Sequence, residues 1–230
     1  MCGIAGFFGN RKIKKNHIKS TLTLMKNRGP DKQKFDHANI DKKKNIYLLH
    51  SRLSIIDLKD RSHQPFILDN YILIFNGEIY NYLELKKKIE NKVNFKTKSD
   101  TEVILHYFKL YGSKCFDYFE GMWSLAIFDI KKNKLILSRD RFGEKPLYIM
   151  KKKEGIYFGS EIKYIKKLAN LQKLEINYNK INHFLQFGYK SIYKNNDSFF
   201  KNIYQLKSSY SVSYTHLRAH ETLMNLVCRL

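Results

Sequence analysis

The sequence predicts an α+β fold in which largely antiparallel sheets pack together and helices cover their outer faces. Segments with strand-like patterns cluster near both ends of the first 160 residues, and helix-like segments lie between them and after them. The regular alternation of strands and helices that marks a doubly wound parallel sheet is missing. With 230 residues, 43% of them hydrophobic, the chain can bury one substantial core.

Strands are predicted where short runs rich in β-branched and aromatic residues are bounded by turn residues. These runs are residues 2–9, 71–75, 122–130, 134–139, 146–150 and 155–159, and residues 45–56 are predicted to be paired strands. The last four runs are close together, which indicates a meander. Asn76-Gly77 follows one run directly and is a strong turn signal, so it is predicted to end that strand.

Helices are predicted where apolar residues recur every three to four positions. These segments are residues 15–27, 81–90, 99–111, 160–168 and 179–187. Asn81 stands at the start of one of them, where its side chain can cap the first turn. The breaker cluster Arg28-Gly29-Pro30-Asp31 predicts a loop after the first helix. The segment 188–207 is predicted to be basic and rich in loops.

The net charge of +22 raises the possibility of nucleic-acid binding, because a basic surface is the electrostatic signature of phosphate recognition. The excess comes almost entirely from lysine, with 35 Lys against 8 Arg, in scattered pairs and triples. Such groups are typical of solvated loops and exposed helix faces. We therefore expect no nucleic-acid partner and keep nucleic-acid binding as an alternative.

The cysteines and apolar runs indicate a cytoplasmic protein with reduced thiols. The apolar runs are too short to span a bilayer, and basic residues follow the first of them instead of preceding it, unlike a signal peptide. Cys2, Cys115 and Cys228 are too widely separated for a disulfide framework or a metal knuckle. The histidines at positions 17, 37, 63 and 106 also lack metal-ligand spacing, so no metal site is expected.

The composition changes abruptly after residue 207. All 35 lysines lie at or before Lys207, whereas residues 208–230 contain no lysine and two of the eight arginines. This change predicts that residues 208–230 are atypical and have a different coding origin, such as a frameshift or cloning read-through. An uninterrupted native reading frame through Leu230 would contradict this hypothesis.

Cys2 combines two chemical functions if Met1 is removed. Its thiol is then accompanied by its own α-amino group, whose pKa of about 7.7–8.0 leaves part of it neutral near pH 7 and able to take up a proton. A nucleophile beside such a base follows the N-terminal-amine variant of covalent catalysis. A cysteine in a first strand is also commonly a small buried hydrophobic residue, so Cys2 alone leaves both interpretations open.

Six motifs in order strengthen the catalytic interpretation. They are Cys2-Gly3-Ile4-Ala5-Gly6, Arg28-Gly29-Pro30-Asp31, His50-Ser51-Arg52-Leu53-Ser54-Ile55-Ile56-Asp57, Asn76-Gly77-Glu78-Ile79-Tyr80-Asn81, Ser99-Asp100-Thr101-Glu102, and Ser138-Arg139-Asp140-Arg141-Phe142-Gly143-Glu144-Lys145-Pro146-Leu147-Tyr148. With these motifs, residues 2–206 resemble the glutaminase domain of the asparagine synthetases, which are class II glutamine amidotransferases. The resemblance implies the N-terminal-nucleophile fold, a four-layer α/β/β/α sandwich with mainly antiparallel sheets.

The resemblance also implies how glutamine is hydrolysed. Cys2 would form a γ-glutamyl thioester while its own amine moves the protons, ammonia would leave first, and water would then release glutamate. The side-chain amide of Asn76 and the backbone N–H of Gly77 would form the oxyanion hole. Asn76-Gly77 can also be only a strand-ending turn, and the two interpretations are compatible.

Further residues are implied to bind L-glutamine. The motif positions are Arg52, Leu53, Ser54, Ile55, Ile56, Asn76, Gly77, Glu78 and Asp100. Arg52 would hold the α-carboxylate with its planar guanidinium, and Asp100 would hold the α-ammonium. Each has a structural alternative: Arg52 as a surface residue, Asp100 as a helix cap, and Glu78 as a side chain that points to solvent.

The predicted organisation is a glutaminase domain at residues 2–170 and a junction toward a synthetase domain at residues 171–207. No pyrophosphate-loop motif of a synthetase domain occurs in the sequence, so we expect a fragment that makes ammonia for a domain it lacks. The glutaminase step is expected to need no cofactor; ATP and Mg would belong to the absent domain, which amidates aspartate. Homodimers are common in the family. The alternatives are a free-standing or inactive module from a polysaccharide or secondary-metabolite pathway.

Overall fold

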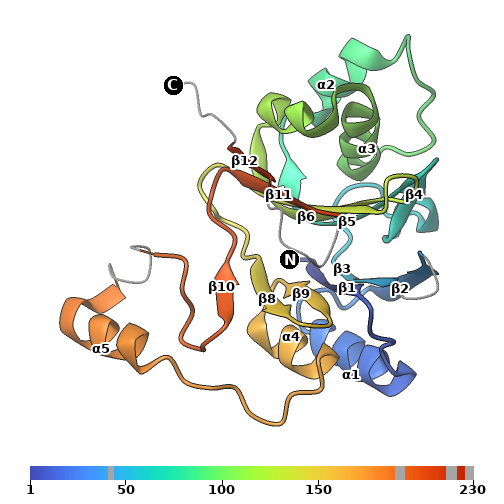
Figure 1. Ribbon diagram of the computed structural model, residues 1–230. Helices are drawn as coiled ribbons and strands as arrows, with labels where there is room; N and C mark the ends of the chain where they lie inside the picture. Colours follow the sequence, from blue (N-terminus) through green and yellow to red (C-terminus); the bar gives the residue numbers. More distant parts are fainter. Residues whose placement is uncertain (41–43, 190–194, 216–221, 226–230) are drawn as a thin grey trace.

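A computed structural model shows two six-stranded sheets packed face to face, with helices on both outer faces (Figure 1). The structure describes residues 1–40, 44–189, 195–215 and 222–225. Every pairing between the named strands is antiparallel. The arrangement is the α+β, α/β/β/α sandwich that the sequence predicts.

The first sheet, called sheet A, contains the N-terminal strand near its centre. Its strand order is β10-β8-β9-β1-β3-β2. The strands are β1 (Gly3–Gly9), β2 (Lys32–Asn39), β3 (Asn45–Arg52), β8 (Tyr148–Lys152), β9 (Gly155–Gly159) and β10 (Ile203–Gln205). Gly3 of β1 lies opposite Ser51 of β3, so the start of β1 and the end of β3 meet at one end of the sheet.

The second sheet, sheet B, lies across from sheet A. Its strand order is β12-β11-β7-β6-β5-β4. The strands are β4 (Phe66–Leu68), β5 (Tyr71–Ile79), β6 (Gly121–Asp129), β7 (Lys134–Arg139), β11 (Tyr210–Tyr214) and β12 (Thr222–Asn225). The short strand β4 pairs with only the first three residues of β5, so the rest of that edge of β5 extends beyond it.

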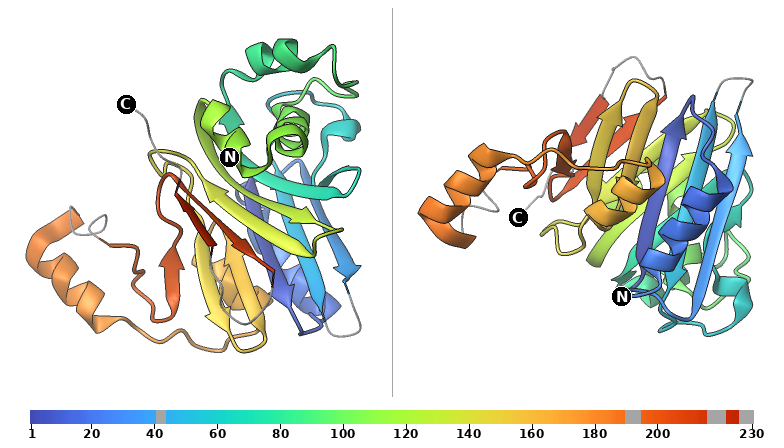
Figure 2. Two further views of the ribbon diagram at one scale, coloured as in Figure 1. Left: turned by 45° about the horizontal axis from the view of Figure 1, so that its top comes forward. Right: turned by 90° about the horizontal axis from the view of Figure 1, so that it is seen from below.

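The helices form the outer layers. On sheet A lie α1 (Lys15–Met25) and α4 (Ile162–Leu168); on sheet B lie α2 (Tyr82–Ile89), α3 (Asp100–Tyr111) and the 3-10 segment η2 (Gly112–Tyr118). A second 3-10 segment, η1 (Asp60–Ser62), lies in the connection between β3 and β4. Helix α5 (Tyr178–Phe187) stands apart from the sandwich beside β10 (Figure 2). Its outlying position leaves Tyr178, Leu185 and Phe187 exposed.

Alternation along the strands creates three apolar clusters. The cluster between the sheets combines residues such as Ile4 and Leu48 from sheet A with Ile74 from sheet B. The other two clusters lie between each sheet and its own helices. Because side chains alternate, residues two positions beyond these core residues face the same inter-sheet space. Cys2 and Asn76 are therefore brought to one end of it.

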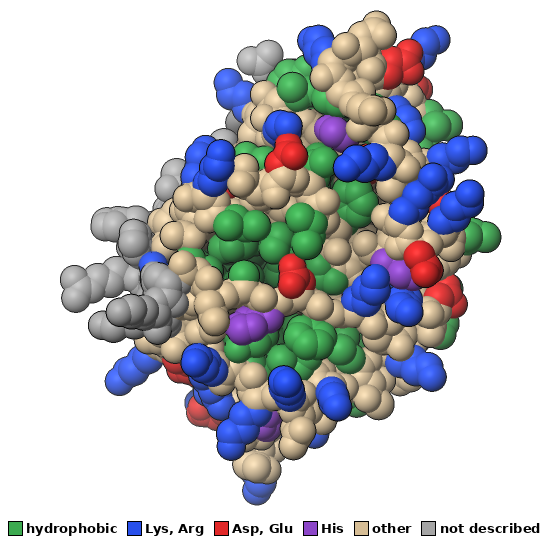
Figure 3. All heavy atoms as spheres, turned by 90° about the vertical axis from the view of Figure 1, so that its right-hand side faces the viewer, with side chains coloured by type: hydrophobic (Ala, Val, Ile, Leu, Met, Phe, Trp, Pro, Cys, Tyr) green, Lys and Arg blue, Asp and Glu red, His purple; other side chains and the backbone are tan. Residues whose placement is uncertain are grey.

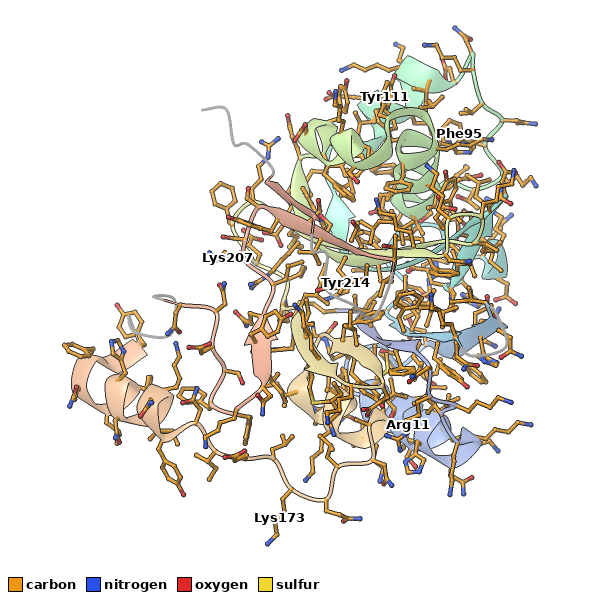
Figure 4. All side chains as sticks on the ribbon, viewed as in Figure 1. Arg11, Phe95, Tyr111, Lys173, Lys207 and Tyr214 are labelled. Atoms are coloured by element: carbon orange, nitrogen blue, oxygen red, sulfur yellow. The ribbon has the colours of Figure 1, made fainter. Side chains whose placement is uncertain are left out.

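Strand β11 connects the end of the chain to the sandwich. It pairs with β7, and its residues Val212 and Tyr214 are buried in the inter-sheet cluster. Figure 4 labels Tyr214. Across the sheets, the ammonium of Lys151 lies 5.9 Å from the centroid of the Tyr214 ring. These contacts describe residues 210–214; the coding origin assigned to residues 208–230 stays a prediction. Cys228 lies outside the described residues.

Several predicted elements differ from the observed ones. Residues 45–56 form one strand followed by a loop; that strand pairs with β1 and with β2, and β2 was not predicted. Asn76-Gly77 lies inside β5 instead of ending it, because the strand continues in register with β6 to Ile79. The expected four-strand meander is divided, with β6 and β7 in sheet B and β8 and β9 in sheet A.

The predicted cap at Asn81 is also wrong. Its side chain makes no capping hydrogen bond to α2. Instead, the amide nitrogen donates to the carbonyl of Tyr118 at 3.0 Å and the amide oxygen accepts from the N–H of Glu120 at 3.1 Å. Asn81 therefore ties the start of α2 to the segment before β6.

Positive charge is dispersed on one face of the molecule. On the face in Figure 3, Lys and Arg side chains are spread around the margin while hydrophobic side chains gather nearer the middle. This distribution agrees with the scattered lysine groups of the sequence. In the part of the chain that the structure describes, no helix has the length and apolar character needed to cross a membrane.

Candidate active site

A cavity lies at the polar end of the space between the two sheets. All predicted site residues except Ser54 line it, namely Cys2, Arg52, Leu53, Ile55, Ile56, Asn76, Gly77, Glu78 and Asp100. The backbone N–H of Ser54 instead donates to the carboxylate of Asp31 at 2.6 Å. The cavity thus joins residues from β5, the segments beside β1 and β3, and the start of α3.

Cys2 is held by the segment that follows β3. Its Sγ accepts from the backbone N–H of Leu53 at 3.4 Å, and its carbonyl accepts from Nε of Arg28 at 2.9 Å. Arg28 in turn pairs with Glu161 at 3.2 Å. Burial raises the pKa of the Cys2 thiol, against the lowering effects of the Leu53 N–H, the nearby N-terminus and Arg52. The thiol is therefore protonated at neutral pH and needs a base to become a nucleophile.

Asn76 and Gly77 approach the cavity from β5. The side chain of Asn76 is almost completely buried, and its amide nitrogen lies 3.4 Å from the hydroxyl of Ser124 on β6. Gly77 is required by close packing, since a Cβ there would come within 2.0 Å of the carbonyl oxygen of Met122. The absence of a side chain lets β5 and β6 stay in contact at the cavity edge.

Asp100 enters from the start of α3, where Ser99 is the capping residue and accepts from the N–H of Thr101. The Asp100 carboxylate accepts from the N–H of Ile79 at 3.2 Å and from the hydroxyl of Ser99 at 3.3 Å. Burial, reinforced by the nearby charge of Glu78, raises the pKa of Asp100 to about 6. A buried carboxylate beside a cavity is suited to bind a cation.

Arg52 organises the loop that walls the cavity. Its two terminal nitrogens donate to the carbonyls of Ile56 and Lys59, both at 3.2 Å, and to that of Asp57. One of them also lies 2.6 Å from Nδ1 of His63. Because a guanidinium only donates, Nδ1 of His63 accepts. Burial and the Arg52 charge both lower the pKa of His63, which matches this neutral ring.

Eight further residues line the cavity and were not predicted as site residues. They are Met1, Ser62, Gln64, Phe75, Ser99, Thr101, Met122 and Lys145. Lys145 arrives on a loop whose backbone N–H groups at Phe142, Glu144 and Lys145 donate to the Asp140 carboxylate. Lys145 belongs to the motif of residues 138–148, in which no site residue was predicted. For Gln64, no sequence signal distinguished it from an ordinary loop residue.

Lys145 lies beside the N-terminus. Its Nζ is 3.2 Å from the sulfur of Met1, and Nη2 of Arg28 is 3.8 Å from the same atom. Burial lowers the pKa of Lys145, with Arg28 contributing in the same direction. Within the described ranges, no group of three or more His, Cys, Asp or Glu residues is arranged to hold a metal ion.

The fold and the cavity define the class of the protein. A four-layer sandwich with residue 2 at one end of the inter-sheet space is the architecture of the N-terminal-nucleophile proteins. The model of the glutamine amidotransferase domain family matches residues 1–222, and the chain belongs to this family.

Named relatives agree with the family. The chain is 38% identical over 218 residues to a putative glutamine-hydrolysing asparagine synthetase of Methanocaldococcus jannaschii, covering 85% of this chain and 42% of that protein. It is 40% identical over 170 residues to glutamine-hydrolysing asparagine synthetase 2 of Bacillus subtilis, covering 71% of this chain and 22% of that protein. The chain therefore spans less than half the length of these relatives.

Solved structures support the fold. The glutamine phosphoribosylpyrophosphate amidotransferase of B. subtilis, complexed with ADP and GMP, superposes with a TM-score of 0.68 at 15% identity. The match covers all of this chain and 50% of that one. At this level of identity, the similarity establishes the shared architecture.

Proposed function

We propose that this chain hydrolyses the side-chain amide of L-glutamine to glutamate and ammonia, with Cys2 as the nucleophile. The observation that carries the proposal is the shared cavity of the Cys2 thiol, the Asn76 amide and the Asp100 carboxylate. These groups provide a nucleophile, a donor for an oxyanion and an anion for an ammonium. Relatives that are named glutamine-hydrolysing add support.

The reaction begins after removal of Met1, which frees the α-amine of Cys2. The amine takes the thiol proton as Sγ attacks the side-chain carbonyl carbon of glutamine. It then gives this proton to the leaving nitrogen, the C–N bond breaks, and ammonia departs. Water attacks the resulting thioester, the amine relays its proton to sulfur, the C–S bond breaks, and glutamate leaves. The raised pKa of the Cys2 thiol explains why an adjacent base is needed.

Asn76 and Gly77 stabilise the tetrahedral oxyanion in this scheme. The amide nitrogen of Asn76 carries two hydrogens and the backbone of Gly77 one, and both residues line the cavity. Donors fixed before the reaction contribute strongly, and loss of one such donor typically lowers kcat about 10²–10³-fold.

Arg52 and Asp100 recognise the amino-acid end of glutamine. Asp100 binds the α-ammonium and Arg52 the α-carboxylate, Glu78 lies nearby, and Leu53, Ile55 and Ile56 form walls. Because the terminal nitrogens of Arg52 already donate to loop carbonyls, a bound carboxylate has to share or replace these partners. We therefore expect this loop to shift when glutamine binds. Ser54 contributes to the glutamine site indirectly, because its backbone N–H donates to the Asp31 carboxylate and so holds the segment that carries Leu53 and Ile55.

In the longer protein, residues 2–170 form the glutaminase domain and residues 171–207 the junction to a synthetase domain. The ammonia serves ATP-dependent amidation of aspartate, with ATP and Mg held by that synthetase domain and not by residues of this cavity. We place the protein in the cytoplasm and allow for a homodimer as part of this proposal. Support comes from the relatives, which are longer asparagine synthetases.

The test measures glutamate release from L-glutamine by the purified chain, with the N-terminal residue determined by mass in the same sample. Turnover that increases with the fraction of chains beginning at Cys2 is the expected result. A chain that retains Met1 should be inactive, because its Cys2 nitrogen is an amide. No turnover by chains with exposed Cys2 would overturn the proposal.

A further inference from the structure

Among the described residues, no strand covers the edge of β5 near the cavity. Strand β4 pairs with β5 as far as Leu73, yet β5 continues to Ile79. The register of β4 would place Gln64 opposite Phe75, but β4 begins at Phe66 and the backbone ladder stops there. The uncovered stretch contains Asn76 and Gly77, the two residues assigned to the oxyanion.

Side chains take the place of the missing strand. The side-chain oxygen of Gln64 accepts from the N–H of Phe75 at 2.6 Å, and Nε2 of His50 lies 3.1 Å from the carbonyl oxygen of Phe75. The amide nitrogen of Gln64 donates to the hydroxyl of Thr101 on α3 at 3.2 Å. His50 and Gln64 are both buried.

The protonation of His50 is fixed by this contact. A carbonyl oxygen can only accept, so Nε2 carries the hydrogen and Nδ1 is the unprotonated nitrogen of the ring. Burial, together with the charge of Arg52, lowers the pKa of His50 to about 3. The ring therefore stays neutral and donates to Phe75 throughout the physiological pH range.

The position of Gly77 follows from its neighbours. Successive backbone N–H groups of a strand point to opposite edges, so those of residues 75, 77 and 79 share one edge. The N–H of Phe75 donates to the side chain of Gln64. The N–H of Ile79 donates to the carboxylate of Asp100 at 3.2 Å. The N–H of Gly77 lies between these two fixed points and faces the uncovered edge beside the cavity.

We propose that His50 and Gln64 are positioning residues for amide hydrolysis. Their side chains hold both backbone groups of Phe75 and thereby fix the N–H of Gly77 and the side chain of Asn76 where an oxyanion forms. Such donors are effective only when their geometry is set before the reaction. The inference rests on the proposed glutaminase function and deepens it.

Two variants remove the supports. His50→Leu deletes the donor to Phe75, and Gln64→Leu deletes the acceptor. Each is expected to lower kcat/KM for glutamine about 10–100-fold, because a misplacement of about 1 Å can cost about 10² in rate. His50→Gln places an amide nitrogen near the position of Nε2 and should recover most of this loss. If His50→Leu fails to fold, Gln64→Leu and His50→Gln still decide the question.

A second measurement distinguishes a loss of oxyanion positioning from a general disturbance of the site around Cys2. Iodoacetamide alkylates Cys2 when the thiolate displaces iodide, and no oxyanion forms in that step. The rate of Cys2 alkylation should therefore stay within about twofold in the leucine variants, well below the loss in turnover predicted above. The matched control is Tyr47→Phe, which removes a buried bond from the N–H of Ile13 to the Tyr47 hydroxyl near the other end of β3. It should lower the melting temperature without lowering kcat/KM.

The possible results distinguish a failure of the positioning role from a failure of the proposed glutaminase function. Wild-type turnover with unchanged kcat/KM in both leucine variants would overturn the positioning role alone. Parallel losses of turnover and alkylation would do the same, because they indicate a disturbed Cys2. An inactive wild-type chain with exposed Cys2 would overturn the glutaminase function and this inference with it.

Discussion

The two ends of the inter-sheet space are built by the same strands and have opposite character. At one end, Phe8 of β1 and Phe128 of β6 pack with their ring centroids 5.9 Å apart, in an apolar cluster. At the other end, the same alternation presents Cys2, Arg52 and Asn76. A single period-two pattern thus changes from core to site within one strand length.

The comparison indicates that one end of the inter-sheet space mainly stabilises the fold and the other end mainly provides the chemistry. Burial of apolar surface at the first end contributes about 25 cal/mol per Å². The second end buries a guanidinium and a carboxylate, charged groups that burial disfavours unless they find partners, and a thiol whose ionised form burial disfavours. The raised pKa of Asp100 shows that its charged form is held against a burial penalty. We therefore expect substitutions at the two ends to have separable effects.

The largest separation is expected from Cys2→Ala. It removes the nucleophile and a small, partly buried thiol, so glutamine turnover should disappear while thermal unfolding changes little. Glutamate release and the melting temperature, measured on one preparation, check both parts. Residual turnover above the background reaction would exclude Cys2 as the nucleophile.

Phe128→Ala is the counterpart at the apolar end. It should lower the free energy of unfolding by about 3–5 kcal/mol, because a large side chain leaves a cavity between the sheets. Below the transition, the folded fraction should keep its kcat/KM for glutamine. Denaturant unfolding and kinetics at low temperature measure the two effects. A loss of kcat/KM in fully folded protein would show that the ends are coupled.

The sequence predicted most of the fold because most strands and helices carry a strong apolar pattern. Strand β2 was missed for the opposite reason. It is an edge strand rich in charged and polar side chains, and only its pairing with β3 makes it a strand. The strong local turn preference of Asn76-Gly77 predicts the end of a strand, yet pairing with β6 overrides that preference.

Site residues that stand in a sequence motif could be predicted. Site residues that are defined only by how the chain folds could not. Cys2, Asn76 and Asp100 stand in recognisable motifs, and the structure brings them into one cavity. Gln64 has no such signal, because its contact to Phe75 depends on where β4 ends. The loop contact of Arg52 is equally invisible in sequence, since it arises from a chain reversal over residues 53–59.

Titration of Asp100 should make both stability and the KM for glutamine depend on pH. Its pKa of about 6 lies above the ordinary value of 3.8, so protonation favours the folded state. The contribution of this group to stability therefore increases as the pH falls from about 6 to about 4 and is lost as the pH rises through 6. Protonation also removes the charge that binds an α-ammonium. The KM for glutamine should rise as the pH falls through about 6.

Asp100→Asn separates this titration from other groups. The variant keeps a similar shape without a charge, so its KM should be high at all pH values and lose the transition near pH 6. Charge-assisted bonds contribute about 1.5–3 kcal/mol, which predicts an increase in KM of about 10–150-fold at pH 7.5. A KM for the unaltered chain that stays constant between pH 5 and 8 would contradict the assigned role.

The smallest effect is expected from Ile46→Val. Ile46 lies opposite Phe8 in the β1–β3 pair. Phe8 is six residues from Cys2 along the chain, which corresponds to about 20 Å at the usual rise of a strand. Removal of one methylene should lower the free energy of unfolding by about 0.5–1.5 kcal/mol. The kcat/KM should stay within about twofold, because the apolar end holds the sheets together without contacting the cavity residues. A larger loss would mean that the spacing of the sheets at Phe8 sets the distance between Cys2 and Asn76. The apolar end would then be part of the catalytic geometry.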